Sequence, residues 1–385
     1  MLNNPASLEA EVAALLQQGR LEEAEGRLRP ALAGGTAPIV LWRQLVQAIR
    51  PRGMIAEARW IQEQLVDAVP GDPTGHFDLA ETLLLLGEFD RGWREYQWRY
   101  RLPHTTRIER KVQRPRWDGR PIPGRTLLIH DEQGLGDTFQ FMRMVAWAKQ
   151  RSQARVVFEI NGETLPLAHR LAGPDQLVER GTIPPAFDLH CELMSLPMVM
   201  GLKLDDLPGS VSYLSPCPTR EAKWRKKLAK LPRPLVALVW AGRPDHPNDA
   251  NRSLTLADLA PLATSGATFL SIQKGPRAIE AQSPPADMNL VSFSDDIRDF
   301  EDTAAILAIA DLLVSVDSSP LHLAGALGRP AWGLLPFIPD WRWLLDREDS
   351  PWYPSLRLFR QASPGDWRGT ISRLAETLRH FRDGA

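Results

Sequence analysis

Residues 315–336 bring an acid, two hydroxyls and an imidazole together at the end of an apolar run. Asp317 ends that run. Ser318 and Ser319 then open a helical pattern, and His322 lies in its first turn. The first N–H groups of a helix lack partners inside the helix and carry partial positive charge, so such a helix start can hold phosphate oxygens. Each residue alone would be ordinary there, but their combination after a buried strand predicts a diphosphate site.

The loop 130–141, HDEQGLGDTFQF, carries a second group of this kind between a strand pattern and a helix pattern. Gly134 and Gly136 allow the backbone to approach a bulky polar ligand, and Asp137 lies where the helix starts. A carboxylate at that position is either a helix cap or a catalytic base. His130 is the alternative base, because imidazole titrates near neutral pH. The loop is neither a GxGxxG motif nor a P-loop, which argues against a dinucleotide or ATP site.

Two further loops follow strand patterns and contain single cations. In the loop 240–256, Arg252 could neutralise a phosphate and Ser253 could cap a helix or donate a hydrogen bond. In the segment 271–276, SIQKGP, Lys274 is placed to meet phosphate or ribose oxygens. An arginine or lysine in a polar loop is also commonly just solvated, so these two positions are weaker indications of a site.

The elements that carry these loops alternate between short apolar runs and helical patterns from residue 125 onward. This alternation predicts an α/β fold with parallel sheets covered on both faces. A stretch rich in Pro and Ser at 207–218 divides it, so we expect an N-terminal half at 125–212 and a C-terminal half at 213–385. Two Rossmann-like halves of this kind would bind ligands in the crevice between the carboxyl ends of their strands. The basic, Pro-rich segment 104–124 is typical of a linker.

Residues 1–103 contain an internal repeat with a period of 34 residues. Three glycines recur at this interval, and a small residue follows each of them five positions later: Gly19 with Ala24, Gly53 with Ala58, and Gly87 with Gly92. A glycine permits the tight turn between two antiparallel helices, and the small residue lets the second helix pack closely on the first. A fixed period with this layout predicts a short helical solenoid, whose concave face would be a surface for a partner. A generic helical bundle is the alternative.

The period and small-residue positions resemble tetratricopeptide repeats. Over roughly residues 115–382, the chain also resembles the GT-B glycosyltransferases related to bacterial heptosyltransferases (family 9) and to O-linked N-acetylglucosamine transferases. The motifs that carry the resemblance are EQGLGDTFQF, the loop with NRSL, SIQKGP, and VDSSPLHLAGALGRP followed by LLPFIPDWRWLLDREDSPWYPSLRLFRQ. Within the last of these, Trp341 and Trp343 either wall the cleft or pack in the core. The resemblance implies a GT-B fold preceded by an all-α repeat region.

The resemblance also implies roles for particular residues. Asp137 matches the acid that is the candidate base toward the acceptor. Asp317, Ser318 and His322 match the contacts to the diphosphate and sugar, and Arg252 matches a basic group less closely. Together with the loops above, the residues expected to contact a nucleotide sugar are Gly134, Gly136, Arg252, Ser253, Lys274, Asp317, Ser318, Ser319 and His322.

Composition narrows the remaining possibilities. The net charge of −1 gives no general attraction to nucleic acid or to a membrane surface. The two cysteines, Cys191 and Cys217, stand outside any CxxC pair, which argues against a disulfide framework or a zinc site and fits a reducing compartment. No apolar run is long enough for a transmembrane span, and no secretory leader is recognisable. A cytoplasmic location is therefore expected.

The predicted function is metal-independent transfer of a sugar from a nucleotide-diphosphate sugar to a hydroxyl of a protein or a saccharide. No cofactor and no metal ligands are expected, because helix N-termini and cations would stabilise the departing diphosphate. A protein acceptor or partner could dock on the repeats, and no nucleic-acid partner is expected. The alternative is a catalytically inactive GT-B-like scaffold or regulatory protein acting through its repeats. A nucleotide-binding epimerase of similar form leaves the repeats unexplained.

Overall fold

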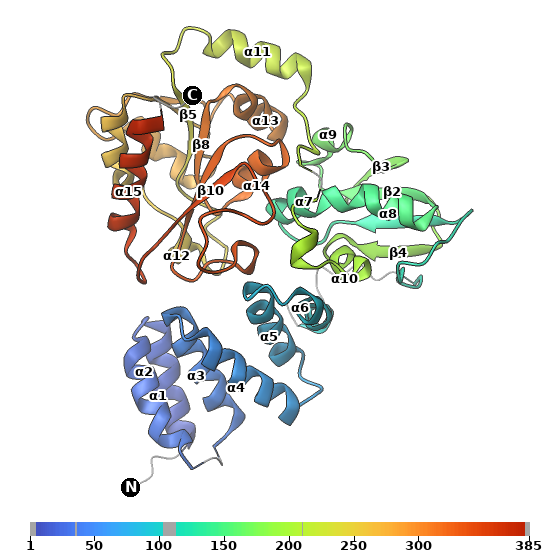
Figure 1. The fold of residues 1–385 in the computed structure, drawn as a ribbon, viewed down its shortest axis with the longest axis vertical. Helices are drawn as coiled ribbons and strands as arrows, with labels where there is room; N and C mark the ends of the chain where they lie inside the picture. Colours follow the sequence, from blue (N-terminus) through green and yellow to red (C-terminus); the bar gives the residue numbers. More distant parts are fainter. Residues whose placement is uncertain (1–4, 35–36, 103–112, 210, 382–385) are drawn as a thin grey trace. The chain divides into compact units, whose positions relative to one another are not determined.

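The computed structural model describes residues 5–34, 37–102, 113–209 and 211–381. Its first part consists of helices that pair across short turns (Figure 1). They are α1 (Pro5–Gln17), α2 (Leu21–Leu32), α3 (Ile39–Ile49), α4 (Ile55–Ala68), α5 (Pro73–Leu85) and α6 (Phe89–Tyr96), with 3-10 turns at Arg50–Arg52 and Gln97–Arg101. The first part of the predicted linker 104–124, residues 104–112, lies outside the described residues.

Each predicted repeat contains a left-handed glycine between its two helices. Gly19, Gly53 and Gly87 have φ angles of 71°, 89° and 78°, a conformation that costs other residues free energy. The small residues that follow are buried, and a Cβ on Gly92 would lie 2.7 Å from Leu84 Cδ2. The predicted turns and close helix contacts are thus confirmed, while the assignment to tetratricopeptide repeats stays a prediction.

Residues 337–345 belong to the same compact unit as these helices, although they come late in the chain. We call these residues together with the helices the helical unit. The Trp341 ring lies 5.3 Å from that of Trp93 at an interplanar angle of 87°, and Trp343 is fully buried. Of the two roles open for these tryptophans, core packing is the one observed.

The N-terminal half contains a four-stranded sheet in which all strands are parallel. Its strands are β1 (Thr126–His130), β2 (Arg155–Ile160), β3 (Gln176–Glu179) and β4 (Leu189–Glu192), in the order β3-β2-β1-β4. The helix predicted after β1 begins at Leu135 and is interrupted by a 3-10 turn. The helices of this half are α7 (Leu135–Phe141), α8 (Val145–Ser152), α9 (Leu165–Ala168) and α10 (Leu196–Met200), and the 3-10 turns include Met142–Met144.

The C-terminal half contains a parallel six-stranded sheet in the order β10-β9-β8-β5-β6-β7. The chain starts in the middle of this sheet, builds outward to one edge, and then returns to build the other side, which is the doubly wound Rossmann order. The strands are β5 (Leu235–Val239), β6 (Thr268–Ser271), β7 (Leu290–Ser292), β8 (Leu312–Val316), β9 (Ala331–Leu335) and β10 (Leu356–Arg360). The helices are α11 (Pro218–Leu228), α12 (Asp249–Arg252), α13 (Phe300–Ile309), α14 (Ser319–Ala326) and α15 (Trp367–His380). The prediction of an α/β fold with two parallel sheets is confirmed.

The two halves form one compact unit, the α/β unit, whose described residues are 113–209, 211–336 and 346–381. Helix α7 of the N-terminal half packs on α14 of the C-terminal half. Arg143, which is buried between the halves, donates to the carbonyl of Trp352 at 2.9 Å and to the Tyr213 hydroxyl at 3.1 Å. Arg170 of the N-terminal half also pairs with Glu301 on α13. Helices in the described ranges all fall short of the length and apolarity needed to cross a membrane.

Candidate functional site

The start of α14 lies directly after the fully buried strand β8. Ser318 is the N-cap residue, with extended backbone angles, and its side chain forms no capping hydrogen bond. Its hydroxyl instead lies 3.0 Å from that of Ser315. The first turn of α14 therefore receives no hydrogen bond from its cap side chain, which suits a helix start that binds an external anion.

His322 is held in a fixed position in the first turn of α14. It is buried, its Nδ1 lies 3.0 Å from the hydroxyl of Tyr353, and its Nε2 lies 3.9 Å from Asp317 Oδ1. Tyr353 packs so closely under the helix that a Cβ on Gly325 would lie 2.4 Å from its ring. The imidazole thus stands between a hydroxyl and a carboxylate, two groups that can hold its orientation. Sequence reasoning did not single out Tyr353, although it lies in a motif that carried the family resemblance.

The glycine-rich loop before α7 meets this helix start, so the structure brings two of the predicted groups together. A Cβ on Gly136 would lie 2.9 Å from His322 Cδ2 and 3.6 Å from the Ser319 Cα. Gly136 has no unusual φ, so the close approach of α14 is what requires a residue without a side chain. Gly134 is the N-cap residue of α7, and its side of the loop is exposed.

The Asp137 carboxylate accepts a hydrogen bond from the Gly134 amide, with a separation of 2.8 Å between N and Oδ2. This is the returning bond of a capping box, and it stabilises the start of α7. The structure therefore shows the capping role that the sequence left open. The role of Asp137 as catalytic base stays a prediction, and its partly exposed carboxylate on the loop that meets α14 is compatible with it.

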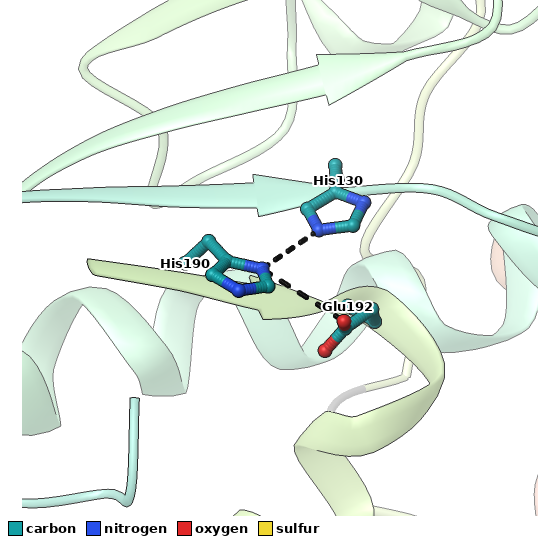
Figure 2. Close-up of side chains that lie close together, drawn as sticks. All are labelled: His130, His190 and Glu192. Carbon is teal, nitrogen blue, oxygen red and sulfur yellow. Dashed lines mark hydrogen bonds and ion pairs between the residues drawn. The ribbon is translucent and has the colours of Figure 1, made fainter. Parts of the chain in front are cut away.

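His130, the alternative base, ends β1 and is 4% exposed. Its Nε2 lies 3.2 Å from Nδ1 of His190 on the neighbouring strand β4, and Glu192 follows on the same strand (Figure 2). Sequence reasoning missed His190 and Glu192. Their signal was the alternation His-Cys-Glu at 190–192, because a strand puts its first and third residues on one face.

Asp131, which was also missed, anchors the loop between His130 and α7. It is 3% exposed, and its Oδ2 accepts from the Asn161 amide at 2.7 Å. Burial raises the pKa of Asp131 to about 6, against the opposing influence of the Asn161 amide and of Arg180. This buried side chain therefore holds the start of the loop to the neighbouring segment at Asn161.

Side chains of the loop after β5 form hydrogen bonds and ionic contacts within the loop itself. The Ser253 hydroxyl accepts from the Gly242 amide at 2.9 Å and donates to Asp249 at 2.8 Å. The Arg252 guanidinium covers Gly242, where a Cβ would lie 2.6 Å from Nη2, and its Nε lies 3.5 Å from an oxygen of Asp249. Both predicted residues thus shape the loop, and their contact with a nucleotide sugar stays a prediction.

Lys274 also has a structural role. Its ammonium group donates to the carbonyls of Ser294 at 2.6 Å and Ile297 at 3.1 Å, which ties the loop after β6 to the segment after β7. A contact between Lys274 and phosphate or ribose stays a prediction.

The fold and this site define a class of protein: an α/β unit of two Rossmann-like sheets whose glycine-rich loop meets a helix start. The profile of Glycosyltransferase family 9 (heptosyltransferase) matches residues 298–336, the segment that contains α13, β8, α14 and β9. Asp317, Ser318, Ser319 and His322 lie within this match.

Several known proteins are similar to this chain in sequence or in fold. Protein FlbA of Caulobacter vibrioides is 28% identical over 339 residues, which cover 81% of this chain and 56% of FlbA. The chain thus spans about half the length of that relative. A family 9 glycosyl transferase from Veillonella parvula has a similar fold, with a TM-score of 0.51 and 11% identity over 68% of this chain and 99% of the other. The ADP-heptose lps heptosyltransferase II of E. coli has a TM-score of 0.49 and 13% sequence identity, over 68% of this chain and 100% of the other.

Proposed function

We propose that this chain is a glycosyltransferase that moves a sugar from a nucleotide-diphosphate sugar to an acceptor hydroxyl. The observation that carries the proposal is the start of α14, where Asp317, Ser318 and His322 gather within the segment that matches family 9. The meeting of this helix start with the glycine-rich loop of the other half supports it further, because donor and acceptor must meet between two such groups.

The C-terminal half would bind the donor without a metal ion. The first turn of α14 offers backbone N–H groups and the positive end of the helix dipole to the diphosphate. Arg252 and Lys274 would add positive charge if the donor draws them from their loop contacts. Asp317 and the imidazole of His322 would meet hydroxyls of the sugar. As the bond between the sugar carbon and the diphosphate oxygen breaks, the N–H groups of α14 and the two cations stabilise the negative charge that develops on the diphosphate.

The N-terminal half would supply the base. The acceptor oxygen attacks the anomeric carbon, and its proton passes to a nearby carboxylate or imidazole. Asp137 is the first candidate because it lies on the loop that meets α14, and His130 is the second. The acceptor would be a saccharide or a protein docked on the repeats. That docking, like a cytoplasmic location, stays a prediction.

A catalytically inactive scaffold or regulatory protein is the second candidate function. It is favoured by the engagement of both candidate bases: Asp137 caps α7, and His130 is buried beside His190. Such a protein would retain the fold and a donor site without turnover, and it would act through its helical repeats.

Thermal-shift measurements with ADP-, UDP-, GDP-, dTDP- and CMP-sugars test the donor site. We expect one diphosphate sugar to raise the melting temperature of the full chain, since a ligand that binds only the native state stabilises it. Asp317→Ala should weaken this shift, whereas Asp245→Ala, at an exposed position in the loop after β5, should retain it. Release of free nucleoside diphosphate in the presence of an acceptor distinguishes the enzyme from the scaffold. If no nucleotide sugar shifts the melting temperature, the proposal fails.

A further inference from the structure

Three metal-ligating side chains share one face of the N-terminal sheet. Strands β1 and β4 are parallel neighbours, and their register places His130 opposite Glu192. His190 precedes Glu192 by two residues, so both point to the same face, while Cys191 between them points to the other. Figure 2 shows the two imidazoles and the carboxylate gathered where the two strands end.

The separations between their polar atoms suit a shared ion. Nε2 of His130 lies 3.2 Å from Nδ1 of His190, and that Nδ1 lies 3.8 Å from Oε1 of Glu192. One ligand atom from each residue lies within 4.8 Å of the others. Two nitrogens at about 2.1 Å from a tetrahedral ion are about 3.4 Å apart, so the imidazole pair needs little movement to bind one.

Burial makes this cluster different from a surface group of acids and histidines. His130, His190 and Glu192 are 4%, 3% and 2% exposed. Oε1 of Glu192 accepts from Nε of Arg116 at 2.9 Å, but Oε2 is buried and has no hydrogen-bond partner among the described residues. A buried carboxylate oxygen without a partner is costly, and coordination to a cation removes that cost.

We propose that His130, His190 and Glu192 bind one divalent transition-metal ion of the zinc or ferrous class. Two imidazole nitrogens and a carboxylate oxygen form a ligand set that suits such ions better than it suits Mg²⁺ or Ca²⁺. Arg116 would act on the ion through Glu192, because its hydrogen bond fixes the orientation of that carboxylate. A water molecule would complete the coordination.

The ion would pin the end of β1 to the end of β4, and so fix the point from which the glycine-rich loop departs. Its ligands all come from the N-terminal half, whereas the diphosphate contacts proposed at α14 come from the C-terminal half, so donor binding would remain metal-independent. A coordinated His130 has no lone pair at Nε2 with which to accept a proton. The base in the proposed transfer would then be Asp137.

Metal binding to the full chain tests this site without any measurement of activity. The purified chain is stripped with a chelator and titrated with Co²⁺, whose visible absorption bands report its coordination, and zinc content is measured by mass spectrometry after Zn²⁺ is restored. We expect one ion per chain. His190→Gln and Glu192→Gln should each weaken metal binding at least about tenfold. Loss of a residue that only hydrogen-bonds to a metal ligand already lowers metal affinity by about that much. His169→Gln, at an exposed position in the same half, should bind as the wild type does.

Circular dichroism shows which variants are folded, and Glu192→Gln decides the test if His190→Gln is unfolded, since glutamine retains the size of glutamate. Failure of the stripped wild type to bind Co²⁺ or Zn²⁺ overturns the proposal, as does undiminished binding by Glu192→Gln. In the first case the two histidines form only a direct hydrogen bond, and in the second the ion binds without Glu192. Neither result bears on whether a nucleotide sugar binds at α14, so the two proposals can fail separately.

Discussion

The two halves of the α/β unit handle polar side chains in opposite ways. In the C-terminal half, the ionisable residues of the candidate site lie in the loops and the helix start beyond the ends of the six-stranded sheet, and strand β8 before that helix carries no ionisable side chain. In the N-terminal half, a four-stranded sheet keeps polar residues inside: His130, His190 and Glu192 belong to the strands themselves and are buried. A site formed by residues beyond the strand ends can bind a ligand that enters from solvent. A buried site within the strands is better suited to stabilising the sheet.

The sharpest test of this contrast is the pair Asp137→Asn and Asp317→Ala. Loss of a general base typically lowers turnover by about 10²–10⁴-fold, so we expect Asp137→Asn to lose at least about 100-fold in turnover with donor affinity unchanged. Asp317→Ala should instead weaken donor binding. Asparagine can still accept the hydrogen bond from Gly134, so capping of α7 is retained. Titration calorimetry measures donor affinity, and steady-state kinetics measures turnover. Normal turnover by Asp137→Asn would assign the role of catalytic base to His130.

The junction of the two halves should be the next most sensitive position. Arg143→Met leaves the Trp352 carbonyl and the Tyr213 hydroxyl without their buried donor. A buried polar group left without its partner costs about 1–3 kcal/mol, so we expect a loss of roughly 3 kcal/mol in the free energy of unfolding. Denaturant unfolding measures it. The exposed Arg155→Met in the same half should cost less than about 1 kcal/mol, and equal losses in the two variants would argue against a special role for Arg143.

Gly136→Ala tests the contact between the glycine-rich loop and α14. The added methyl would lie 2.9 Å from His322 Cδ2, so the loop or the imidazole must move, at a cost of about 1–3 kcal/mol. We expect donor affinity to fall about tenfold. Gly26→Ala in α2 is the control, since its methyl would meet no atom within 4 Å. Should the two alanines weaken donor binding equally, the contact with His322 is not what positions the loop.

The smallest effect is expected from Tyr353→Phe. This change removes the hydroxyl 3.0 Å from His322 Nδ1 but retains the ring that packs under Gly325. The net loss from one hydrogen bond is about 1 kcal/mol, so donor affinity should fall about fivefold. Calorimetric titration with the donor measures it. Tyr100→Phe, in the helical unit, serves as the control and should leave donor affinity unchanged; a Tyr353→Phe affinity equal to wild type would mean that His322 is oriented by other contacts.

The same contrast explains what the sequence could predict. The buried strands β5, β8 and β9 were predicted because each is a continuous apolar run, and the start of α14 was predicted because its polar residues are consecutive. Details inside elements were harder. The helical pattern that follows the loop 240–256 forms a 3-10 helix, Ala257–Ser265, which contains Pro261 and so lacks the N–H that an α-helix needs there.

The parts of the candidate site that sequence reasoning missed depend on pairing between distant segments. His130 and His190 are 60 residues apart and meet only because β1 and β4 are neighbours in the sheet. Arg143 lies within an apolar helical pattern, and its partners come from two other segments of the chain. No local spacing encodes such a contact, so the strand order had to be known before these residues could be linked.

The packing of Trp341 against Trp93 has a consequence for how the protein is made. The helices of the helical unit leave the ribosome before the α/β unit, but the residues that complete their core, 337–345, are translated only after most of the α/β unit. A nascent chain would therefore expose the apolar surface around Trp93 throughout synthesis of the α/β unit. Domains usually fold in the order in which they emerge, and exposed apolar surface favours aggregation. A truncated chain that ends near residue 103 would stay in this unfinished state permanently, so the repeats should be expressed together with the rest of the chain.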